Sequence, residues 1–240
     1  SDWSSDVCSS DLLLGWTNAR ADSIFAVQGL GSYAVLAAGD AAQRAALPDL
    51  AAGRAVAAFG LTEPEAGSDV AAIATRAVAD GDGYRLTGEK MFISNLGLAS
   101  VATVVATVDP ALGRKGLTAF WLRLDGAGVT VVPQAPIAPH PLGRLILDGA
   151  RATRIGEVGA GFGLAMRTLD TFRVSVAAAA VGMARRALDE ATRHVRARVQ
   201  FGKPLADQPL VQAHLADMAT QVDSARLMTW VAMSAKWACT

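Results

Sequence analysis

The chain has 240 residues, of which 52% are hydrophobic and 18% charged, and its mean hydropathy is +0.30. This composition excludes a disordered or low-complexity chain, because such chains are poor in apolar residues and rich in charge. The 22 basic residues cancel the 22 acidic ones. A dedicated nucleic-acid binder usually carries a basic excess, so we expect no nucleic-acid partner.

Few residues suggest a disulfide, a metal site or a membrane anchor. The two cysteines lack paired spacing, which favours a reducing compartment, and we expect a cytoplasmic protein. The three histidines are scattered, so we expect no metal site. The longest apolar run, Val176–Met183, is much shorter than the ~20 residues that cross a bilayer, so no membrane span is expected.

The first twelve residues differ from the rest of the chain in composition. Ser1–Leu12 is rich in serine and lacks alanine, which dominates the remainder of the sequence. Asp6–Leu12 can be back-translated to the end of a common sequencing-adapter oligonucleotide. We therefore expect residues 1–12 to be an artefact tail, which would make Cys8 foreign to the native protein. The alternative is an ordinary polar N-terminal tail.

Residues 13–57 are rich in alanine and carry a helical pattern. Gly39-Asp40 can begin a short helix over residues 41–47, and Pro48 is expected to end it, because proline interrupts a helix interior. The segment predicts a helical region before the first strand.

Residues 58–155 change to runs of strand length that are rich in β-branched and aromatic residues. Glycine and aspartate in Asp80–Gly83 supply the backbone freedom that a tight hairpin turn requires. No helical pattern separates the runs, which favours an antiparallel barrel or sandwich over a parallel sheet. The expected strands cover residues 75–79, 84–87, 101–108, 117–124, 129–132 and 144–147.

Residues 156–240 are helical again, with apolar residues three and four positions apart over 184–195 and 211–225. Gly159–Gly163 is expected to form a loop that leads into a helix. Gly202 and Pro204 interrupt the helical pattern, and Pro209 suits the first turn of the next helix. The fold class is therefore α+β, in the order helices, β domain, helical bundle.

The segment Ala58–Asp69 carries the clearest functional signal. It ends a strand-like run with a turn that is rich in small and hydroxylated residues. Exposed backbone N–H groups and the hydroxyls of Thr62 and Ser68 could hold a polar ring or a pyrophosphate. Alone, the segment could be only a capped turn. The segment Phe92–Asn95, some 25 residues later, argues against this simpler interpretation.

Several segments of the chain resemble the motifs of one protein family. Leu61–Asp69 resembles the LTEPxAGSD signature of the acyl-CoA dehydrogenases, and Gly88–Asn95 is similar to their GxKxWITN segment. Several ordered motifs are far more specific than one. Three further segments resemble the family: Gly156–Phe162 the loop before the first C-terminal helix, Leu169–Arg173 the substrate-side end of that helix, and Arg198–Lys203 the RxxFGK flavin-contact motif.

The resemblance covers roughly residues 13–237 and implies an acyl-CoA dehydrogenase-like fold. Residues 13–57 would be the remnant of an N-terminal helical domain. Residues 58–155 would form the middle β domain, and residues 156–240 an incomplete C-terminal helical bundle. The chain would then be a fragment truncated at both ends.

The resemblance also implies FAD as the cofactor. Thr62 would hydrogen-bond the pyrimidine edge of the flavin, and Ser68 would contact its pyrophosphate. Phe92 stands where the family usually has tryptophan against the ring, and Ser94 replaces a threonine whose hydroxyl faces N5. The cofactor-binding residues expected from one subunit are Leu61, Thr62, Gly67, Ser68, Phe92 and Ser94.

Arg198, Gln200 and Phe201 match residues that reach the adenosine-diphosphate end of a flavin held by a neighbouring subunit. The resemblance therefore implies a homodimer or homotetramer. Substrate contacts would come from Ser68, Asp170 and Arg173. A solvated arginine at a helix end and an intrahelical Asp–Arg ion pair are the simpler alternatives for these positions.

The family's reaction is α,β-dehydrogenation of an acyl-CoA thioester: a carboxylate base removes the α-proton, and the β-hydrogen passes as hydride to flavin N5. The resemblance thus implies an oxidoreductase of fatty acid metabolism that passes electrons to an electron-transfer flavoprotein. Most members carry the base at a position expected beyond Thr240. A minority carry it at the position of Phe172, which cannot accept a proton, so we expect this chain alone to be inert. The alternatives are a flavin-dependent oxidase or monooxygenase, or a non-catalytic flavin-binding relative.

Overall fold

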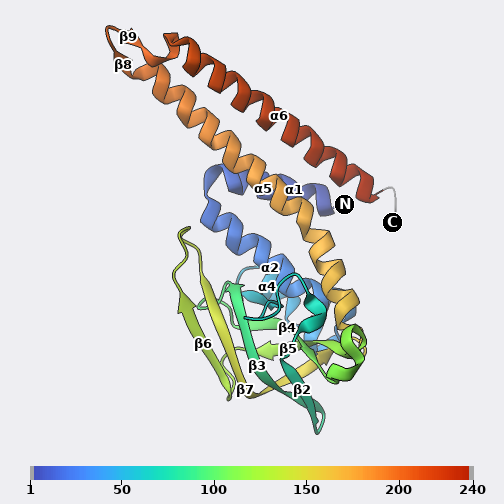
Figure 1. The fold of residues 1–240 in the computed structure, drawn as a ribbon. Coiled ribbons are helices and arrows are strands. Elements are labelled where there is room, and N and C mark those ends of the chain that lie inside the picture. Colours follow the sequence, from blue (N-terminus) through green and yellow to red (C-terminus); the bar gives the residue numbers. More distant parts are fainter. Residues whose placement is uncertain (1–2, 238–240) are drawn as a thin grey trace. The chain divides into compact units, whose positions relative to one another are not determined.

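The computed structural model describes residues 3–237, whose contacts divide the chain into two compact units (Figure 1). We call residues 23–172 the sheet unit, and residues 3–22 together with 173–237 the helical unit. The long helix α5, Gly161–Ala197, contributes residues to both units.

The sheet unit is built on seven strands, five of which close into a barrel. The pairings run from β4 through β2, β3, β7 and β5 and return to β4. β1 lies beside β4, and β6 lies beside β7. The strands are β1 Ala57–Gly60, β2 Arg76–Asp80, β3 Gly83–Ser94, β4 Val101–Thr107, β5 Leu117–Arg123, β6 Val129–Gln134 and β7 Leu142–Ile155.

The expected α+β fold is confirmed, and of the two expected forms of the β domain, an antiparallel barrel or a sandwich, the structure has a barrel. β2 and β3 join through the predicted hairpin turn, in which Gly81 has φ = 61°. Most pairings are antiparallel, but β1 and β2 each run parallel to β4, so the sheet is mixed. Two strands are much longer than predicted: β3 continues to Ser94, and β7 covers Leu142–Ile155 in place of residues 144–147.

The barrel interior is filled by side chains from several strands. Leu86, Phe120 and Leu145 are fully buried, and the ring of Tyr84 lies 5.0 Å from that of Phe120. Each fully buried side chain of this size contributes about 1.5–3 kcal/mol. The barrel is therefore a packed support for the loops that leave its strands.

Helix α2, Ala19–Ala38, packs on the barrel through its later part. Val35 is fully buried in an apolar cluster with residues of β5, β7 and α5. The amide of Gln28 donates to the carbonyls of Leu50 (2.6 Å) and Ala55 (2.8 Å) and accepts from the N–H of Ala57 (2.7 Å). By length and composition alone α2 could cross a membrane, but these contacts are those of a helix that covers a sheet.

Two short helices connect α2 to the first strand. α3, Ala41–Arg44, begins at Asp40, whose side chain accepts from the N–H of Gln43 at 2.8 Å, as expected for a helix start. α4, Leu47–Ala51, holds Pro48 in its first turn. The prediction that Pro48 ends a helix is wrong, because proline in a first turn loses no hydrogen bond. Short 3₁₀ segments lie at η1 Val70–Ala72, η2 Pro110–Gly116, which is kinked at Gly113, and η3 Leu205–Asp207.

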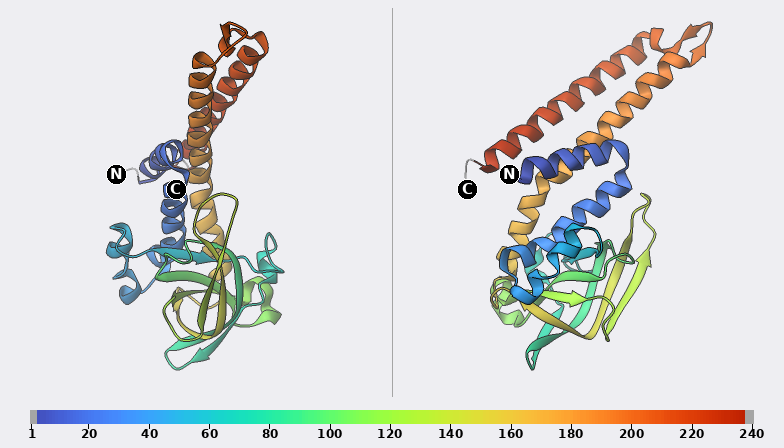
Figure 2. Two further views of the ribbon diagram at one scale, coloured as in Figure 1. Left: turned by 90° about the vertical axis from the view of Figure 1, so that its left-hand side faces the viewer. Right: turned by 180° about the vertical axis from the view of Figure 1, so that it is seen from behind.

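The helical unit contains α1 Trp3–Thr17, the later part of α5, and α6 Pro209–Trp237. Figure 2 shows α5 and α6 side by side, joined by the small hairpin of β8 Val199–Gln200 and β9 Lys203–Pro204. The predicted long helices, the interruption between them and the start of α6 at Pro209 are confirmed. α5 also begins, as expected, within the glycine-rich loop.

The segment expected to be an artefact tail lies partly inside α1. Residues 3–12 form the first part of this helix, so the boundary expected after Leu12 falls within a helix. Ser1 and Asp2 lie outside the described residues. Side chains from the second half of the segment are buried, among them Cys8 and Asp11.

Candidate functional site

The loop Leu61–Asp69 begins where β1 ends and leads to η1. Glu63 and Ala66 exchange backbone hydrogen bonds of 2.9 and 3.3 Å, which fold the loop tip into a tight turn. Thr62 is half-buried, and Gly67 and Ser68 are exposed, so these predicted ligand-binding residues reach the surface. The side chain of Leu61 is buried in an apolar cluster, so Leu61 can offer a ligand only its backbone.

The loop is fastened to β3 by an ion pair and a backbone hydrogen bond. Nζ of Lys90 lies 2.7 Å from Oε1 of Glu63 and 3.1 Å from the carbonyl oxygen of Leu61. The N–H of Met91 donates to the carbonyl of Thr62 at 2.9 Å. The sequence prediction that the two motifs form one site is consistent with this arrangement, because Thr62 and the end of β3 lie next to each other.

Burial and pairing act in opposite directions on the two charges. Burial lowers the pKa of Lys90 to about 8, although Glu63 opposes the shift, so Lys90 is mainly charged at neutral pH. Burial acts to raise the pKa of Glu63, but Lys90, Thr75 and the N–H of Ala74 outweigh it and lower that pKa below its usual value. The pair is therefore ionised at neutral pH.

Sequence reasoning named neither Glu63 nor Lys90 as a site residue. The available signal was the strand period, since Lys90 stands four positions after the buried Leu86 and therefore faces the same side of β3. A lysine in that register predicts a buried acidic partner. The partner is 27 residues away in sequence, and no local pattern identifies it.

The end of β3 has an unusual backbone. Phe92 has φ = 57° and Asn95 has φ = 68°, and the pairing of β3 with β7 shifts register between Lys90 and Ile93. Positive φ is costly for residues other than glycine and persists only where the surroundings impose it. The amide of the buried Asn95 donates to the carbonyls of Ala57 (3.1 Å) and Ile24 (3.2 Å). Phe92 is 60% exposed, and Ser94 is half-buried.

The remaining predicted site residues belong to the β8–β9 region and to α5. Arg198, Gln200 and Phe201 belong to the β8–β9 hairpin of the helical unit, and all three are exposed. Phe201 has φ = 52° and a 98% exposed side chain. Asp170 and Arg173 are exposed residues of α5, three positions apart, so both sit on the helix surface as expected.

Phe172 cannot serve as a base or as a ligand-facing group on the surface. Its side chain is 4% exposed and meets the ring of Tyr33 edge-on at 6.0 Å. Its ring also occupies the space next to Gly29, where an added Cβ would lie 2.4 Å from a ring carbon. Phe172 is thus a packing residue between α5 and α2.

The groups at the loop and at the end of β3 fit a flat ligand with a polar edge and phosphate groups. Phe92 offers an exposed aromatic face, which can stack on a ring system. Thr62, Ser68 and Ser94 offer hydroxyls, and the loop offers backbone N–H groups. Among residues 3–237, no group of three or more His, Cys, Asp or Glu residues is placed to hold a metal ion.

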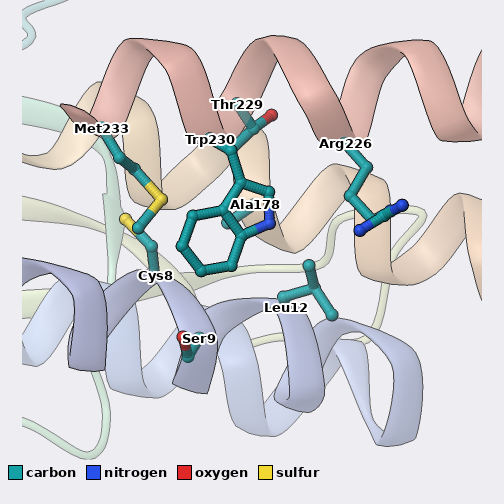
Figure 3. Close-up of a pocket in the computed structure, with 8 residues that line it drawn as sticks. All are labelled: Cys8, Ser9, Leu12, Ala178, Arg226, Thr229, Trp230 and Met233. Atoms are coloured by element: carbon teal, nitrogen blue, oxygen red, sulfur yellow. The ribbon is translucent and has the colours of Figure 1, made fainter. Parts of the chain in front are cut away.

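The helical unit contains a cavity of about 260 Å³ (Figure 3). Cys8 and Leu12 of α1, Ala178 of α5, and Trp230 and Met233 of α6 line it. Part of its wall therefore comes from the segment expected to be an artefact. We assign it no ligand.

Two domain families of the acyl-CoA dehydrogenases match the chain. "Acyl-CoA dehydrogenase, middle domain" matches residues 58–150, and "Acyl-CoA dehydrogenase, C-terminal domain" matches residues 159–238. The probable acyl-CoA dehydrogenase FadE25 of Mycobacterium tuberculosis is 41% identical over 222 residues, which are 90% of this chain and 57% of the relative. The caffeyl-CoA reductase-Etf complex subunit CarC of Acetobacterium woodii is 37% identical over 198 residues, which are 78% of this chain and 51% of the relative.

Among solved structures, the glutaryl-coenzyme A dehydrogenase glutaryl-CoA complex superimposes with a TM-score of 0.92 at 32% identity, over 95% of this chain and 60% of that chain. The chain thus spans about half the length of the curated relatives it matches. The matched regions include the loop Leu61–Asp69 and the end of β3.

Proposed function

The chain belongs to the acyl-CoA dehydrogenase family, and we propose that it carries part of the site at which an acyl-CoA dehydrogenase oxidises the Cα–Cβ bond of an acyl-CoA thioester. The observation that carries this proposal is the placement of Thr62 beside the end of β3, where Phe92 exposes its ring. An exposed aromatic face next to hydroxyl donors can stack on a flavin ring, whereas a ring that only packs the core would be buried.

We propose FAD as the cofactor, and when bound it supplies the hydride acceptor. The Thr62 hydroxyl and nearby N–H groups would donate to the polar edge of its ring, and Phe92 would stack on the ring. Ser94 would offer a second hydroxyl near the ring, and Ser68 with the N–H groups around Gly67 would hold the phosphates. The barrel keeps these groups in place before the ligand arrives.

The acyl-CoA substrate would meet Ser68 and the surface of α5 that carries Asp170 and Arg173. We assign no catalytic base within the chain, because Phe172 has no ionisable group and the family's other position is expected beyond Thr240. The residues present would bind and orient the cofactor and thioester. The chain alone should therefore not turn over substrate.

We further propose that the functional form is a homo-oligomer that passes electrons to an electron-transfer flavoprotein, in the cytoplasm. The fully exposed Phe201, with Arg198 and Gln200 beside it, supports the oligomer, since an aromatic ring in water is suited to contact another subunit. The relative that is a subunit of an Etf complex supports the electron-transfer partner.

The test is a titration of FAD with the chain, followed by the quenching of flavin fluorescence. We expect saturable binding that Thr62→Ala and Phe92→Ala each weaken. Thr130→Ala, which changes an exposed threonine on β6, should bind as the unaltered chain does. Absence of binding, or equal binding by all variants, would contradict the proposal.

A second measurement separates the family's chemistries. Acyl-CoA added to the FAD-loaded chain should leave the flavin absorbance unchanged, since no base is assigned. Bleaching of the flavin would show that the chain contains its own base, and rapid recovery of the colour in air would favour an oxidase.

A further inference from the structure

Lys90 is fully buried in the sheet unit, and its burial requires an explanation because a buried ammonium loses its hydration. A buried ion pair is weak evidence for stability, since apolar residues of similar volume are often equally stable. Such pairs can instead select one geometry over others. The contacts of Lys90 identify the geometry that is selected here.

Three segments of the chain meet at the Glu63–Lys90 pair. Lys90 binds the carboxylate of Glu63 and the carbonyl of Leu61. Glu63 also accepts from the N–H of Ala74 at 2.7 Å and from the N–H of Thr75 at 3.0 Å. The pair therefore ties the loop after β1 to β3 and to the residues that lead into β2.

Thr62 lies between the two loop residues that the lysine binds. The carbonyl of Thr62 itself accepts from the N–H of Met91, so Thr62 and the residues before and after it are all hydrogen-bonded. On the other strand, Phe92 follows Met91 directly and adopts positive φ. The same few hydrogen bonds thus hold the backbone of Thr62 next to the strand segment that carries Phe92.

We propose that Glu63 and Lys90 are positioning residues that hold Thr62 and Phe92 in register with each other at the ligand site. That the ligand is FAD rests on the function proposed above, whereas the geometric role does not. Neither side chain needs to touch the ligand, since Lys90 is fully buried and Glu63 is 6% exposed. Their effect reaches the ligand through Thr62 and Phe92.

The test variant is Glu63→Gln combined with Lys90→Met. Glutamine keeps one carbonyl acceptor for the N–H of Ala74 or Thr75, which donate to different oxygens of Glu63. Methionine fills the volume of the lysine stem without a charge. The matched control removes an exposed ion pair of the same unit, Arg123→Met with Asp125→Asn, whose atoms lie 2.7 Å apart.

The first readout is hydrogen exchange of backbone amides in the ligand-free chain. We expect the Met91 amide to lose protection in the test variant, while the Phe120 amide of the barrel stays protected. Retained protection at Met91 would overturn the proposal. Loss at both amides would also overturn it, because the pair would then hold the whole sheet.

The second readout is FAD binding by fluorescence quenching, with the shape of the flavin absorption band. The dissociation constant should rise by about tenfold or more in the test variant, with a changed band shape, and stay unchanged in the control. Unchanged FAD binding with exposed Met91 would overturn the role at the ligand site. If the unaltered chain binds no FAD, the proposed function fails, and the exchange data still decide the positioning role.

Discussion

The buried carboxyl of Asp11 should make the helical unit less stable as the pH rises. Asp11 is fully buried, close to the buried Asp22. Burial, and after it the charge of Asp22, raise the pKa of Asp11 from 3.8 to about 7, while the hydroxyl of Ser175 acts in the opposite direction. The folded state thus binds a proton at Asp11 more tightly than the unfolded state does. The stabilisation that this proton gives the folded state is complete below about pH 4 and is lost as the pH rises through about 7.

The substitution Asp11→Asn removes this dependence, because asparagine does not ionise. A difference of about three pKa units corresponds to about 4 kcal/mol. Access of water and local relaxation reduce the penalty, so we expect about 2 kcal/mol. Near pH 8 the variant should be more stable than the unaltered chain by that amount, and the difference should shrink towards about pH 5.

The assay is urea unfolding followed by far-UV circular dichroism at several pH values. Asp217→Asn, which changes an exposed aspartate of α6, is the matched control and should follow the unaltered chain at every pH. A gain for Asp11→Asn that does not vary with pH, or a loss at alkaline pH, would refute the reasoning.

Three further predictions concern the sheet unit and can be measured by urea unfolding. Phe120→Ala should cost about 3–5 kcal/mol, because the ring is fully buried in the barrel, and a cost below about 1 kcal/mol would contradict its role there. Gly88→Ala should cost about 3 kcal/mol, since φ is 150° and the new Cβ would lie 2.6 Å from Oγ1 of Thr75. Gly81→Ala places its Cβ in open space and should cost about 1 kcal/mol. Equal costs for the two substitutions would argue against the steric explanation. Asp40→Ala should cost about 1 kcal/mol by removing the helix cap, and no change would mean that the cap is redundant.

The strands were predictable where one local signal governed them. The β2–β3 turn is marked by its glycines, and β4 and β5 are runs rich in β-branched, aromatic and other apolar residues. β7 was not predictable in full, because its buried positions fall at 143, 145 and 147 and then shift to 150 and 152. Gly149, with φ = 64°, interrupts the alternation. A pattern with period two is hidden by one such irregularity.

The sequence indicated candidate ligand-binding groups but did not identify the buried ion pair that supports their backbone. Motifs placed Thr62, Ser68, Phe92 and Ser94 because the family resemblance marks them. The buried pair beneath them depends on a contact between distant segments. Its cost in lost hydration shows only in the folded chain, where Lys90 is 0% exposed.

Residues on both sides of the composition change at Leu12 pack closely against α5. On one side of it, Gly15 lies so close to α5 that an added Cβ would be 2.4 Å from the carbonyl oxygen of Ala179, and Trp16 donates to Asp189 at 2.9 Å. On the other side, Asp11 brings a carboxyl into a buried position beside a second one. On that side Cys8 also packs in an apolar cluster, and a Cβ added to Gly182 would lie 2.1 Å from the carbonyl oxygen of Leu12. Replacement of Asp11 by an apolar residue should therefore stabilise the helical unit more than Asp11→Asn does, because asparagine still buries a polar amide at this position.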